Sequence, residues 1–161
     1  MRDILQAEGR FTVVCYRDGV EVWRDSFPNT VVTAGKNDLL TNYFKGAAYT
    51  AAFYLGLKNS AGGVVAGDTM GSHAGWTESS AYSNGTRPAA TFGSASGGSI
   101  DNSGSPATFN INGTDTIYGA FLTTNNTKGG STGTLYSAGD FGASRAVASG
   151  DVLSVTWTGT V

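Results

Sequence analysis

The chain has 161 residues, a length that fits a single domain able to build a hydrophobic core of its own. Twelve acidic and ten basic side chains nearly balance, so the charge provides no strong field to attract nucleic acid. The 24 glycines separate short runs rich in Thr, Val, Phe and Tyr, which is typical of turns between β-strands, and an aromatic share of 11% argues against a disordered chain.

The first residues show no apolar stretch of signal-peptide length, and no later stretch is long and apolar enough to span a membrane. We therefore expect a protein made in the cytoplasm, with residues 1–8 as an N-terminal arm and residues 9–161 as one domain. The arm supplies four candidate contact residues for a protein partner: Met1, Arg2, Ile4 and Leu5.

Two β-rich runs come first, residues 9–17 and 20–27, with Asp18-Gly19 between them. This dipeptide tolerates positive φ angles and predicts a tight type I′ hairpin. The single cysteine, Cys15, lies in the first run among apolar residues, which indicates a small buried side chain and not a reactive thiol.

A helix is predicted over residues 34–45, with Thr33 as its N-cap and Gly46 in the left-handed position after its end. Its apolar side chains recur at spacings of three and four and are Leu39, Leu40, Tyr43 and Phe44. We expect this short amphipathic helix to seal the sandwich with its apolar face.

Alternation over residues 49–58 predicts a central strand, and residues 89–93 predict a short one after Pro88. Residues 98–101 predict weak pairing, and clear alternation resumes at residues 107–112, 116–124, 132–137, 145–147 and 152–158. About nine strands and one helix predict an all-β protein, an antiparallel jelly-roll-like β-sandwich.

Residues 67–87 have no strand pattern and contain a Trp, a Tyr and the only His of the chain. Long ordered connections are usually functional, so we expect a contact surface there. Its candidate interface residues are Met70, His73, Trp76, Tyr82 and Arg87. Two of them also have structural interpretations, His73 as a hydrogen-bond partner of loop backbone and Arg87, like Arg145, as a bridge to a carboxylate or backbone.

The sequence shows no motif for a metal site, a serine triad or a phosphate-binding loop. His73 lies five residues from both Asp68 and Glu78, which matches no metal-ligand spacing. We therefore expect no metal, no cofactor and no enzymatic activity. A glycosidase with Asp68 and Glu78 as its carboxylate pair stays open as a hypothesis.

Several segments, taken in their order, resemble a family of small structural proteins encoded by tailed bacteriophages. They are residues 29–40, 53–57, 67–78, 82–88, 117–122 and 150–153, and the resemblance extends from Val31 to the C-terminus. It implies a virion structural protein, a capsid cement or decoration protein on the outer surface of the head shell. The implied partners are the major capsid protein and copies of the chain itself, as a dimer or trimer, with no nucleic acid and no membrane.

An alternative is a receptor-binding or carbohydrate-binding module associated with a tail tip or fibre. In that hypothesis Trp76 and Tyr82 stack on a sugar face beside Asp68 and Glu78.

Overall fold

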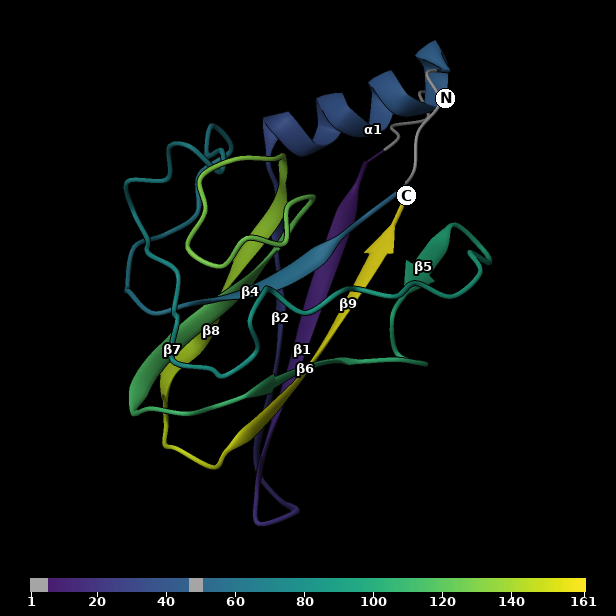
Figure 1. Ribbon diagram of the computed structural model, residues 1–161. Helices are drawn as coiled ribbons and strands as arrows, with labels where there is room; N and C mark the ends of the chain where they lie inside the picture. The colour runs from purple at the N-terminus through teal and green to yellow at the C-terminus, as the bar shows by residue number, and fades with distance from the viewer. Residues whose placement is uncertain (1–5, 47–50) are drawn as a thin grey trace.

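A computed structural model describes residues 6–46 and 51–161, which form nine strands in two antiparallel sheets and one helix (Figure 1). The first sheet has the order β2-β1-β9-β5, with β6 also paired to β9, and the second has the order β3-β8-β7-β4. The strands of the first sheet are β1 (Glu8–Arg17), β2 (Val20–Pro28), β5 (Ser99–Asp101), β6 (Ala107–Asn110) and β9 (Val152–Thr160). Those of the second are β3 (Thr30–Val31), β4 (Tyr54–Lys58), β7 (Asp115–Thr123) and β8 (Leu135–Val147). The predicted β-sandwich is confirmed, whereas this strand order does not show a jelly-roll connectivity.

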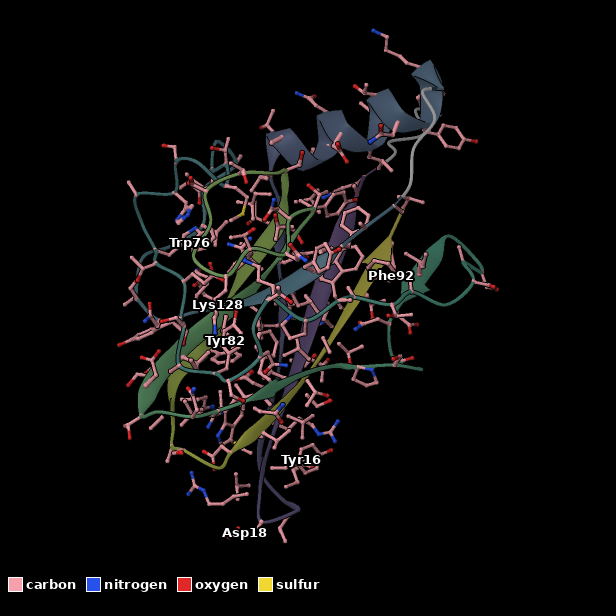
Figure 2. The ribbon with its side chains drawn as sticks, viewed as in Figure 1. Tyr16, Asp18, Trp76, Tyr82, Phe92 and Lys128 are labelled. Carbon is pink, nitrogen blue, oxygen red and sulfur yellow. The ribbon has the colours of Figure 1, made fainter. Side chains whose placement is uncertain are left out.

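The β1–β2 hairpin is confirmed where it was predicted. Asp18 and Gly19 have φ angles of 52° and 77°, the pair of positive values that a type I′ turn needs. The turn projects from one end of the sandwich, at the bottom of the view in Figures 1 and 2. Near this turn the exposed side chains of Val20 and Val22 lie on β2.

The main core lies between the two sheets and is built by alternating side chains. In β9, Leu153, Val155 and Trp157 are buried and face the core together, as their spacing predicts. Cys15 of β1 is also completely buried there. Burial raises the pKa of its thiol to about 11, so Cys15 stays protonated and serves as an apolar packing residue.

A second, smaller core lies on the outer face of the second sheet. Successive residues of a strand point to opposite faces of the sheet. In β7, Ala120 and Leu122 belong to the main core, so Phe121 between them points to the outer face, where it belongs to another cluster. We call this cluster the outer core; its buried members are Val32, Met70, Trp76, Phe121, Leu135 and Ala138. We define residues 59–90 as the covering loop. Its first part, with Met70 and Trp76, therefore covers the outer face of the second sheet, whereas Tyr82 and Ala90 of its second part belong to the main core.

The same loop covers the free edge of β4. A strand was predicted over residues 49–58 in the centre of a sheet, but β4 begins at Tyr54 and lies at the edge, with β7 as its one strand neighbour. Residues 47–50 lie outside the described part. Loop backbone replaces a second neighbour: Ser79 N donates to Leu57 O (2.8 Å) and Leu55 N donates to Pro88 O (2.9 Å). These bonds occupy edge groups that would otherwise be open to another strand.

Two other strand predictions are corrected. Residues 89–93 form no strand, only a single bridge between Ala89 and Tyr54. Residues 132–137 and 145–147 are not separate strands, since β8 runs continuously from Leu135 to Val147. Of the intervening residues, Ala138 and Gly139 have weak strand propensity but are paired with β7, and the register of the two strands shifts beyond Asp140.

The helix α1 (Thr33–Lys45) crosses one end of the sandwich, at the top of Figure 1. Gly46 has a φ of 60°, so the predicted left-handed end is confirmed. Thr33 is not the N-cap: Val32 holds that position and no side chain caps the helix. The amide of Thr33 instead donates to the carbonyl of Ala66 in the covering loop (2.8 Å), a tertiary bond that the sequence pattern does not reveal. No helix of residues 6–46 and 51–161 is long and apolar enough to cross a bilayer.

The helix lies on β8 through its small residues. Gly35 is its only buried residue, and a Cβ at that position would come within 2.7 Å of the Cα of Tyr136. We expect Gly35→Ala to destabilise the protein by about 1–3 kcal/mol, because the backbone contact must open. In a helix free of such contacts the same change would stabilise by about 1 kcal/mol, so the sign is informative.

Urea unfolding followed by circular dichroism measures this effect. Gly142→Ala is the matched control, since a Cβ at Gly142 would meet no atom within 4 Å. A Gly35→Ala variant as stable as the unmodified protein would show that α1 does not depend on this close approach.

Candidate protein-interaction surface

The predicted contact residues of the covering loop are not exposed. Met70, Trp76, Tyr82 and Arg87 each retain 2% or less of their accessible surface, and His73 is half-buried. The prediction that Met70, Trp76, Tyr82 and Arg87 form an exposed contact surface is therefore wrong. Of the arm, Met1, Arg2, Ile4 and Leu5 lie outside the described residues.

Trp76 organises the first part of the covering loop (Figure 2). Its ring packs 5.1 Å from that of Phe121, and its indole Nε1 donates to Asp68 Oδ2 (3.0 Å). The imidazole of His73 stacks on the indole at 3.8 Å and its Nδ1 donates to the carbonyl oxygen of Trp76 (2.8 Å). The predicted hydrogen bond of His73 to loop backbone is confirmed. The segment is ordered by burial of one large aromatic residue and not by local periodicity.

Arg87 fastens the second part of the covering loop. Its Nε and Nη2 donate to the two carboxylate oxygens of Glu78 (2.8 and 2.7 Å), a bidentate ion pair. The same guanidinium donates to the carbonyl oxygens of Asn125 and Gly130 (both 2.9 Å) in the connection between β7 and β8. The predicted structural role of Arg87 is confirmed. Arg145 likewise bridges to Asp25, at 3.3 Å.

Tyr82 is held from the same connection by Lys128, whose label lies beside that of Tyr82 in Figure 2. The Lys128 Nζ donates to the carbonyl oxygens of Tyr82 (2.8 Å) and Asn84 (2.9 Å) and lies 4.3 Å from the centre of the Tyr82 ring. Sugar stacking needs an exposed ring face, so the buried Tyr82 and Trp76 contradict the carbohydrate platform predicted on these two residues.

The carboxylates of this region have structural partners. Both oxygens of Glu78 are taken by Arg87, and Glu78 Oε2 also accepts from the amide of Gly129 (2.9 Å). Asp68 accepts from the amide of Val65 as well as from the indole. A carboxylate clamped in this way is poorly placed as an acid or nucleophile, which weakens the glycosidase hypothesis. Within residues 6–46 and 51–161 no three His, Cys, Asp or Glu side chains are grouped to hold a metal ion.

An exposed apolar surface lies instead on α1. Leu39 and Leu40 are 38% and 47% exposed, Tyr43 is 79% exposed and Phe44 is 72% exposed. We call these four side chains the helix face. The expectation that they seal the sandwich is wrong, because α1 is turned the other way and directs small and polar residues toward the body of the protein. These inward residues are Ala34, Gly35, Asp38 and Asn42.

A groove continues from the helix face onto the sandwich. Its volume is about 270 Å³, and its walls are mostly apolar, formed by Leu39, Tyr43, Phe53 and Tyr136 with Asp38 and Asn42 at their side. Burial, together with the charge of Asp38, raises the pKa of Tyr136, so its hydroxyl stays neutral. Beyond Phe53 the ring of Phe92 continues the aromatic surface at a centroid distance of 5.9 Å.

A second pattern in the helix sequence, separate from the spacing of its apolar residues, indicates which side of α1 faces the sandwich. Ala34, Asp38 and Asn42 recur at intervals of four and thus share a stripe next to Gly35. A small-residue stripe permits close approach of a helix to a sheet even though it is less apolar than the opposite stripe. The helix and its amphipathic character were predictable, but the direction of its apolar face was not.

Comparison of the sequence with models of protein families finds no match, and comparison with curated proteins finds no significant match either. Any functional assignment therefore rests on the residues and contacts described above and on the resemblance noted in the sequence.

Proposed function

We propose that this chain is a structural protein of a tailed-phage virion, a capsid decoration protein that binds the outer surface of the head shell and stabilises it. The observation that supports the proposal best is the helix face. Four large apolar side chains gathered on an exposed helix, with polar residues turned inward, indicate a surface that a partner covers. The resemblance to phage structural proteins makes the shell, built from the major capsid protein, the partner of choice.

The energetics suit such a role. Burying apolar surface contributes about 25 cal/mol for each Å², so covering the two exposed aromatic rings and the adjoining groove is a substantial gain. A shell presents many identical sites, and dimers or trimers of this chain would engage several of them at once, which multiplies a modest affinity. Because such a protein binds assembled sites and not dissociated subunits, it shifts the equilibrium toward the intact shell.

The construction of the domain also fits a passive, load-bearing role. The covering loop is fastened to the sandwich by the Glu78–Arg87 ion pair and by Lys128, and Trp76 fills the outer core. A rigid surface loses little conformational entropy on binding. Nothing in this arrangement requires a moving part.

Co-sedimentation of the purified protein with empty head shells of the encoding phage tests the proposal. We expect the double variant Tyr43→Ser/Phe44→Ser to bind shells at least about tenfold more weakly. A tenfold rise in Kd corresponds to a loss of only about 1.4 kcal/mol of binding free energy. The matched control is Val20→Ser/Val22→Ser, which also removes two exposed apolar side chains, but on the β1–β2 hairpin.

The control variant should bind shells as tightly as the unmodified protein does. Shells with the unmodified protein bound should melt at a higher temperature than bare shells. Equal binding by both double variants would remove the helix face from the interface. Absence of any binding by the unmodified protein would overturn the decoration role.

A second candidate function, a carbohydrate-binding module of the tail, is favoured by one observation. The groove places the aromatic rings of Tyr43 and Phe53 beside the carboxylate of Asp38 and the amide of Asn42, the types of group that stack on and hydrogen-bond to a sugar. Glycan-array binding that is lost in Asp38→Ala, with shell binding absent, would support this candidate over the first.

A further inference from the structure

We propose that Lys58 and Asp140 react with each other to form an isopeptide bond, an amide between the two side chains that joins β4 to β8 across β7. This inference does not depend on the proposed function. It follows from the way the second sheet and the covering loop enclose one lysine.

The register of the second sheet places the two side chains together. Gly119 of β7 pairs with Lys58 on one side and with Asp140 on the other, so the three residues lie in one row across the sheet. Gly119 has no side chain between the two, and a Cβ there would come within 3.0 Å of the Asp140 Cα on β8. The Lys58 Nζ contacts Asp140 Oδ1 directly.

Burial of Lys58 favours a neutral, nucleophilic amine, since its side chain is completely buried. The Trp76 ring, 5.4 Å from Nζ, and the carbonyl oxygen of Gly62, which accepts a hydrogen bond at 3.3 Å, hold the amine in place. Burial lowers the pKa of the Lys58 ammonium, because the charged form loses its hydration. A desolvated amine held against a carboxyl group is the geometry that accelerates an intramolecular condensation.

Asp140 lies at the edge of this enclosure and leaves a path for the water that a condensation releases. Its side chain is 39% accessible, whereas the Lys58 side chain is completely buried. The amine is thus held away from water while the carboxyl group that it contacts can lose water.

The reaction is balanced without an oxidant or a cofactor. Across their contact one proton passes from the Lys58 ammonium to the Asp140 carboxylate, which gives a neutral amine and a carboxylic acid. The lone pair of Nζ attacks Cγ of the acid, and a C–N bond forms. A second proton passes from nitrogen to the hydroxyl of the acid, and as the C–O bond breaks that hydroxyl leaves as water. One amide and one water molecule replace one amine and one carboxylic acid.

Intact-mass spectrometry of the purified full chain tests the proposal directly. We expect the protein to be lighter than its sequence by the mass of one water molecule, and a digest to contain a branched peptide that joins Lys58 to Asp140. Lys58→Arg, which keeps the positive charge, and Asp140→Ala should each restore the full mass. Lys128→Arg is the matched control, since Lys128 is also enclosed but donates only to carbonyl oxygens, and it should keep the mass deficit.

A succinimide at Asp18-Gly19 would also lose one water, so the digest must locate the change. An unmodified protein of full mass, or a mass deficit that maps to any site other than the Lys58–Asp140 pair, would overturn the proposal and leave an ordinary ion pair.

Discussion

Arg87→Ala should destabilise the protein by about 3–5 kcal/mol, since removing one partner of a buried ion pair leaves the other charge buried without compensation. The guanidinium of Arg87 is fully buried, and Glu78 is nearly so. Its loss would also leave the carbonyl oxygens of Asn125 and Gly130 without this donor. Urea unfolding monitored by tryptophan fluorescence measures the change.

Arg24→Ala provides the matched control for this variant. Arg24 makes an ion pair with Glu21 on β2, but both side chains are largely exposed, and exposed pairs of this kind contribute little. Its unfolding midpoint should stay unchanged. If Arg87→Ala were as stable as the Arg24→Ala variant, the covering loop would not depend on its guanidinium.

Trp76→Ala should cost about 3–5 kcal/mol, the range typical of removing a large aromatic side chain from a core. The cavity would open beside Phe121, and the Asp68 carboxylate would lose its indole donor. We expect the covering loop to become sensitive to protease in this variant at temperatures where the unmodified protein resists. Limited proteolysis and thermal unfolding measure the two effects.

The contrasting variant is Tyr43→Ala, because Tyr43 is also a large aromatic residue but is exposed. It should leave the thermal midpoint unchanged and weaken binding to head shells. The opposite pattern, a stable Trp76→Ala protein that no longer binds shells, would restore the covering loop as the interface and remove the helix face from that role.

The two pairs of variants separate stability from recognition within one small domain. Arg87 and Trp76 are the types of residue that often anchor interfaces, yet here they hold a loop to its own sandwich. In the proposed function the partner is bound by the helix face, whose side chains are exposed in the isolated chain.

Local sequence determined the features that depend on neighbouring residues. The Asp18-Gly19 turn, the alternation of β9 and the helix end at Gly46 were predictable because turn geometry, strand periodicity and left-handed backbone are properties of a few consecutive residues. The β-sandwich follows from the number and spacing of such strands. The structural roles of His73 and Arg87 were also foreseen from their residue types.

Only the tertiary structure decided which face of each element is covered. Periodicity shows that Tyr43 and Phe44 share a side of α1, but the close approach of Gly35 to Tyr136 determines that this side is exposed. Periodicity likewise does not predict that Trp76 packs on Phe121, because that contact joins distant parts of the chain. Burial depends on what lies opposite a side chain in space, and the sequence near that side chain does not contain this information.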